Sequence, residues 1–126
     1  DASDFKVAKE LGLTLIPTHE VRSIGIEETI KRAREVIGNN KVFLTFDIDF
    51  IDPAYAPATG GPEVGGYTSY EGLQFIRGFK GLNFVGMDIV EVAPMYDVAE
   101  ITSLLAAYLV FEFLSILAIN KKEKKE

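Results

Sequence analysis

The chain has 126 residues, of which 48% are hydrophobic and 25% charged, a composition typical of one soluble globular domain with a moderate core. Its net charge of -6 disfavours nucleic acid as a partner, because the overall field would repel a phosphate backbone. The lack of cysteine excludes disulfides, thiolate zinc sites and cysteine nucleophiles, and agrees with a cytoplasmic location.

The first third of the chain predicts two helices with a short strand between them. Apolar spacing in residues 3–11, followed by Gly12, predicts a helix that stops at a glycine. The apolar run LTLIP, residues 13–17, predicts a strand. Apolar residues then recur every three or four positions in residues 25–37, which predicts an amphipathic helix that ends at the sequence GNN.

Two further strands follow. Residues 41–49 (KVFLTFDID) and 82–92 (LNFVGMDIVEV) are continuous apolar runs, typical of strands covered on both faces by helices. A loop rich in proline and glycine, residues 50–68, and a predicted helix, residues 69–79, connect them. Another helix is predicted over residues 97–119. Strands that alternate with helices predict an α/β fold in one domain, with a parallel sheet between helical layers.

The last predicted helix is nearly long enough and apolar enough to span a bilayer. Between Ile101 and Ile119 it carries one charge, Glu112, at a mid-segment position where a carboxylate is costly in lipid. Such a helix is also expected in the core of a larger protein or at a subunit contact. We therefore expect it to be buried in protein, and we expect no membrane partner.

Carboxylates gather where the predicted strands end. On one strand, Asp47 and Asp49 would point to the same side about 6 to 7 Å apart, and at an effective dielectric of about 20 they would repel by about 2 to 3 kcal/mol. A basic partner, a proton or a bound cation must offset that repulsion. Ligands of parallel sheets bind beyond the carboxyl ends of the strands, so we predict a metal or catalytic role for both aspartates. Glu91 ends the third strand and is predicted to bind a cationic group such as a guanidinium.

Other polar residues have simpler interpretations. Asp52 is expected to cap the turn after the strand, and Asp88 is expected to be a hydrogen-bonded structural group. His19, the only imidazole, is expected to be a surface or packing residue. Ser69, with Glu71 nearby, predicts the start of a helix.

Two stretches resemble motifs of the ureohydrolases, the arginase and agmatinase family. TFDIDFIDPAYAPATGGPEVGG, residues 45–66, is similar to the second metal-binding signature of that family, and GMDIVEVAPMYDVAEIT, residues 86–102, is similar to its next motif, in the style of the agmatinase group. The resemblance implies the three-layer α/β/α arginase fold. It also implies a pair of manganese ions bridged by a hydroxide that attacks a guanidinium carbon, in an enzyme that forms trimers or hexamers.

On this template Asp47 and Asp49 would be manganese ligands, and Glu91 would face the guanidinium of a small cationic substrate. The substrate implied first is agmatine, which would give putrescine and urea. Arginine, guanidinobutyrate and formiminoglutamate are alternative substrates. A catalytically inactive scaffold or oligomerisation protein of the same fold is an alternative function.

The sequence also departs from the family pattern. The upstream motifs that supply the other metal ligands, a histidine after paired glycines and a DAHxD segment, do not occur here. Residues 1–126 are therefore expected to be the carboxyl-terminal part of a single ureohydrolase domain, inactive without its amino-terminal half. Gly61 stands where the family's TGTP turn commonly has threonine, and Val98 stands where a polar residue often follows the sequence YD. Both departures bear on which substrate the complete enzyme would accept.

Overall fold

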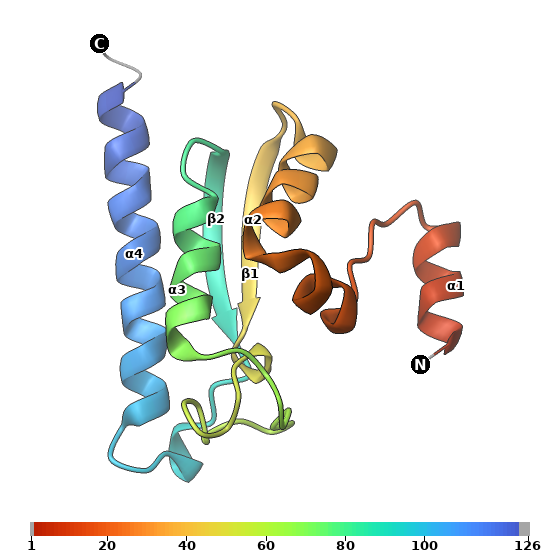
Figure 1. Cartoon of the computed structure of the whole chain (residues 1–126). Helices are drawn as coiled ribbons and strands as arrows, with labels where there is room; N and C mark the ends of the chain where they lie inside the picture. Colours follow the sequence, from red (N-terminus) through yellow and green to blue (C-terminus); the bar gives the residue numbers. More distant parts are fainter. Residues whose placement is uncertain (1, 124–126) are drawn as a thin grey trace. The chain divides into compact units, whose positions relative to one another are not determined.

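The computed structural model describes residues 2–123, which divide into two compact units, one up to Gly38 and the other from Asn39 onward. The first unit contains the helices α1 (Ala2–Glu10) and α2 (Thr18–Ile37) (Figure 1). The second contains β1 (Lys41–Asp47), the 3-10 turn η1 (Ile48–Phe50), α3 (Ser69–Gly78), β2 (Asn83–Val90), the 3-10 turn η2 (Pro94–Tyr96) and α4 (Ile101–Glu123).

The helix α1 confirms the first predicted helix and its glycine stop. Gly12 has a φ of 70°, and the N–H groups of Gly12 and Leu13 donate to the carbonyls of Lys9 and Ala8. This pattern satisfies the last carbonyls of the helix. The predicted strand over residues 13–17 is wrong, because these residues are irregular in the structure. An apolar run becomes a strand where a neighbouring strand pairs with its backbone, and composition does not supply that neighbour.

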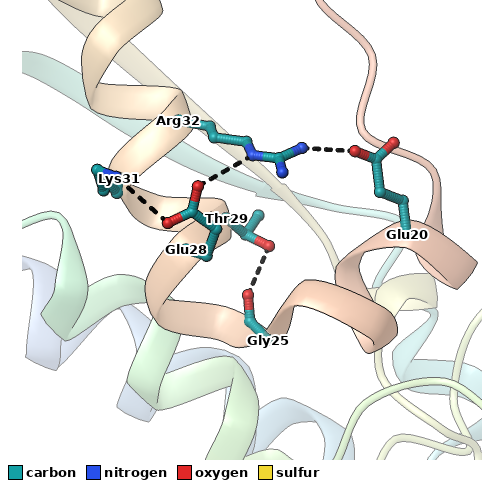
Figure 2. Close-up of polar contacts among 6 residues, drawn as sticks. All are labelled: Glu20, Gly25, Glu28, Thr29, Lys31 and Arg32. Carbon is teal, nitrogen blue, oxygen red and sulfur yellow. Dashed lines mark hydrogen bonds and ion pairs between the residues drawn. The ribbon is translucent and has the colours of Figure 1, made fainter.

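The helix α2 contains the predicted helix over residues 25–37 and an earlier segment that the sequence analysis missed. The segments meet at Gly25, whose φ of 84° and ψ of 167° are open chiefly to glycine. Pro17 precedes the first segment without a side-chain cap, so no capping residue marks its start. Arg32 donates to Glu28 at 3.2 Å in its own segment and to Glu20 at 2.5 Å across the kink (Figure 2). Of the two pairs, only the one between Arg32 and Glu20 links the two segments across the bend.

In the second unit, β1 and β2 pair in parallel and α3 connects them, which confirms the predicted βαβ arrangement. The register pairs Thr45 with Asp88 and Asp47 with Val90, so both strands end at the same edge. The strands are shorter than predicted, because a 3-10 turn begins directly after Asp47.

The helices α3 and α4 pack beside each other along one face of this sheet (Figure 1). Phe84 of β2 meets Phe113 of α4 edge to face, with ring centroids 5.0 Å apart. On the opposite face Phe43 and Val85 are 59% and 62% exposed. Within the second unit, α3 and α4 therefore form a helical layer on one face of the sheet, and the predicted α/β fold with a parallel sheet is confirmed.

The helix α4 is long and apolar enough to cross a membrane, judged by length and composition. One face is buried in protein, as expected, and Glu112 accepts a hydrogen bond from Arg77 of α3 at 3.0 Å. The outer face remains apolar and exposed. The buried positions recur every three or four residues, at Thr102, Leu105, Leu109, Phe113 and Ile116.

Candidate metal and substrate site

The strand β1 ends in a tight turn that carries both candidate aspartates. Asp47 is the last strand residue, and its Oδ1 accepts the N–H of Asp49 at 2.9 Å. Ile48 between them is fully buried, which anchors η1 in the core. Asp49 therefore projects from a 3-10 turn, and the prediction that both aspartates leave the same side of a strand is wrong. The hydrogen bond from Asp49 to Asp47 nevertheless keeps the two residues together.

The loop after η1 folds back on the turn and supports it. Asp52 Oδ1 accepts the N–H of Ala54, and Oδ2 accepts the N–H of Gly65, both at 2.8 Å. This confirms that Asp52 caps the turn. Farther along, the N–H of Tyr67 donates to the carbonyl of Phe50 at 2.9 Å. The end of the loop is thus hydrogen-bonded both to η1, through Phe50, and to the side chain of Asp52 just after it.

The end of β2 brings Glu91 to the same edge. Glu91 has a φ of 64°, a left-handed conformation that is uncommon for residues other than glycine. Immediately after it, Val92 forms an antiparallel bridge with Thr59, and the N–H of Ala93 donates to the carbonyl of Ala58 at 2.9 Å. These contacts hold residues 58–61 beside the end of β2.

Two glycines of that loop lie against the candidate carboxylates. An ideal Cβ on Gly60 would be 3.8 Å from Glu91 Oε2, and one on Gly61 would be 2.7 Å from Asp49 Oδ2. The structure therefore brings Asp47, Asp49 and Glu91 together around residues 60–61, at the carboxyl edge of the sheet.

The surroundings of Asp49 are unusual for a carboxylate. Burial, followed by the negative charges of Asp47, Glu91 and Glu63, raises the pKa of Asp49 above its ordinary value. Its Oδ1 is buried and has no hydrogen-bond partner in the structure. Within residues 2–123, the charges that shift this pKa are all negative. A cation at this position would remove the cost of an unpaired, partly buried anion.

These oxygen donors fit a hard divalent cation as part of a ligand set. Within the part of the chain that the structure describes, no three or more His, Cys, Asp and Glu side chains are placed to hold a metal ion. Asp47 and Asp49 could therefore bind such an ion in a complete site only together with ligands supplied from elsewhere.

The remaining polar candidates have structural positions. His19 is exposed in the first turn of α2, which confirms its interpretation as a surface residue. Asp88, which was expected to be a hydrogen-bonded structural group, is exposed on the sheet. The helix α3 starts at Ser69, as predicted, with a capping box between Thr68 and Glu71.

Two residues of this edge were not predicted from the sequence. Glu63 contributes negative charge at Asp49, and Thr59 is buried with an Oγ1 that has no hydrogen-bond partner. Both lie in the glycine-rich loop that directly follows Asp47 and Asp49, and this nearness in sequence is the signal that could have identified them.

Comparisons with known proteins show one family to which this chain is similar. The sequence model of the Arginase family matches residues 1–115. The agmatinase of Enterobacter sp. (strain 638) is 48% identical over 115 residues, which cover 91% of this chain and 38% of that protein. The chain thus spans less than two fifths of the length of this relative.

Solved structures show the same fold. The crystal structure of a hypothetical agmatinase from Burkholderia thailandensis matches with a TM-score of 0.84 and 39% identity, over 90% of this chain and 36% of that one. Proclavaminate amidino hydrolase from Streptomyces clavuligerus matches with a TM-score of 0.86 and 38% identity, over 90% of this chain and 39% of that one.

Proposed function

The chain belongs to the arginase family, and from this premise we propose that it is the carboxyl-terminal part of a manganese-dependent ureohydrolase that converts agmatine to putrescine and urea. The observation that carries the proposal is the convergence of Asp47, Asp49 and Glu91 at the carboxyl edge of the sheet, where the buried Oδ1 of Asp49 has no hydrogen-bond partner. The similarity to agmatinases supports agmatine as the substrate.

Asp47 and Asp49 would hold the metal through their carboxylate oxygens. Divalent metal ions, when bound, supply Lewis-acid activation of water and offset the negative charge of both aspartates. The turn η1 fixes the Asp47 side chain through its hydrogen bond with the N–H of Asp49. The chain's own contribution is thus to present two oxygen ligands from a turn anchored in the core.

Glu91 would bind the substrate. Its two carboxylate oxygens can accept the paired N–H groups of a planar guanidinium. The left-handed backbone at Glu91 and the bridge from Val92 to Thr59 fix the direction in which it leaves the strand. Hydrolysis adds water to the guanidinium carbon and breaks its bond to the alkyl nitrogen, which takes up a proton and leaves as the amine.

We also propose that the amino-terminal half of the longer protein supplies the other metal ligands, and that the chain by itself is inactive. The incomplete ligand set of residues 2–123 and the coverage of the relatives support this. A cytoplasmic, trimeric or hexameric enzyme is part of the same proposal.

Metal content and urea release of the complete protein test the proposed function. We expect the purified protein to retain manganese and to release urea from agmatine faster than from arginine, guanidinobutyrate or formiminoglutamate. Asp47→Ala and Asp49→Ala should each lower activity by more than the roughly 10- to 100-fold that follows loss of a residue supporting a metal ligand. Glu10→Ala, which removes an exposed carboxylate of α1, is the matched control and should change neither quantity.

Two outcomes would contradict the proposal. A complete protein that binds no manganese and releases no urea from any of these compounds would favour the inactive scaffold. Faster urea release from another substrate of the panel would retain the reaction class and replace agmatine.

A further inference from the structure

Gly61 is the position where the sequence departs from the TGTP turn of the family, and it lies directly against Asp49. A Cβ on Gly61 would be 2.7 Å from Asp49 Oδ2 and 3.7 Å from its Cγ. The shorter distance is well inside van der Waals contact, so a side chain at residue 61 and the present position of the Asp49 carboxylate exclude each other.

The neighbouring Gly60 has no such relation to a carboxylate. A Cβ there would meet Glu91 Oε2 at 3.8 Å, an ordinary contact. Neither Gly60 nor Gly61 is among the glycines with positive φ, so the backbone accepts alanine at both positions. Alanine substitutions at Gly60 and Gly61 are therefore a matched pair: the new methyl group displaces the Asp49 carboxylate at residue 61 but not at residue 60.

The surroundings of Asp49 restrain it. The turn η1 ties the N–H of Asp49 to Asp47, and the charged groups that act on its carboxylate, Asp47, Glu91 and Glu63, are all acidic. A side chain at residue 61 would therefore shift a carboxylate that has no cationic group among these neighbours to receive it.

We propose that Gly61 is a positioning residue, which lets the Asp49 carboxylate rest against the loop backbone, where a side chain at residue 61 would displace it. Its consequence for cation binding rests on the function proposed above. The steric coupling between residues 61 and 49 does not depend on that function.

A double-mutant cycle on the complete, metal-free protein tests the coupling. Gly61→Ala should lower the Tm by about 2 °C, because about 1 kcal/mol produces 2 to 4 °C in a domain of 150 to 250 residues and a smaller shift in a larger one. In an Asp49→Ala background the same substitution should leave the Tm unchanged, because the displaced carboxylate is gone. Gly60→Ala should be neutral in both backgrounds. An equal loss in both backgrounds, or an equal loss from Gly60→Ala, would overturn the proposal.

A manganese titration tests the consequence for the site. Gly61→Ala should tighten the apparent Kd for Mn2+ by about 5-fold, because the metal-free state loses its resting position for Asp49. Gly60→Ala should leave this Kd unchanged. An unchanged or weaker Kd for Gly61→Ala would refute the role in metal binding. If the unmodified protein binds no Mn2+, the proposed function fails, whereas the thermal cycle still decides whether Gly61 positions Asp49.

Discussion

The surroundings of Asp49 and Asp97 shift the pKa values of these two carboxyl groups in opposite directions. Asp49 has acidic neighbours and an unpaired buried oxygen, and its pKa is raised by burial and by these charges. Asp97 is also desolvated, which would raise its pKa, but hydrogen bonds from Ser103 and Thr102 outweigh this effect and lower its pKa to about 2. The anion of Asp97 is therefore satisfied by protein donors, whereas the buried Oδ1 of Asp49 has no hydrogen-bond partner.

Asp97 stabilises the start of α4 by accepting hydrogen bonds from Thr102 and Ser103. Because its folded pKa lies below the ordinary 3.8, it stabilises the fold above pH 3.8, and this contribution is lost as the pH falls toward 2. Asp97→Ala should therefore lower the Tm at neutral pH, and the difference from the unmodified chain should disappear near pH 2. Thermal unfolding followed by circular dichroism across this pH range measures it. A difference independent of pH would show that the hydrogen bonds do not stabilise through the ionised group.

Among the structural elements, the loop between η1 and α3 determines whether the candidate site can form. Gly66 passes so close to η1 that a Cβ would lie 2.6 Å from the nitrogen of Asp52 and 2.9 Å from the carbonyl oxygen of Phe50. These contacts are to backbone atoms, which cannot rotate away. Gly65 has a φ of 85° but open space around its Cβ position, so the two adjacent glycines are required for different reasons.

We predict that Gly66→Ala destabilises the fold by about 3 kcal/mol, at the upper end of the cost of overpacking. Gly65→Ala should cost about 1 to 2 kcal/mol, the strain of a left-handed backbone at one residue. Unfolding in urea, compared between the two variants, measures the difference. Equal costs would mean that the loop can move away from η1, and that η1 does not depend on it for support.

At the scale of the whole molecule, apolar side chains remain uncovered on two surfaces. The free face of the sheet exposes Phe43 and Val85, and the outer face of α4 exposes Leu104, Phe111 and Leu114. Exposed apolar patches of this kind favour association. The chain should therefore behave as part of a larger assembly of protein.

We accordingly predict that the 126-residue chain self-associates when it is expressed by itself. Phe111→Lys combined with Leu114→Lys should shift its mass toward the 13.9 kDa monomer in light scattering, because two charges then interrupt the outer face of α4. Val64→Lys, which alters an 89% exposed loop residue, is the control and should have no such effect. A monomeric unmodified chain would contradict the prediction.

Much of the second unit could be predicted from local patterns. The apolar runs identified β1 and β2, the capping residues identified the start of α3, and the motif around Asp47 and Asp49 identified the family. The edge that carries Asp47, Asp49 and Glu91 followed from the rule that parallel strands end on the same side. The roles assigned to these three residues remain predictions.

By itself, then, the sequence determined the helices and strands of the second unit and the position of the acids at the strand ends, because periodicity, capping and turn chemistry act over a few neighbouring residues. Tertiary structure decided the rest: residues 13–17 form no strand, α2 begins before the kink at Gly25, and Asp49 lies on a turn. The contact between Gly61 and Asp49 belongs to the same class. Each depends on groups distant in the sequence, whose pairing and packing no local pattern records.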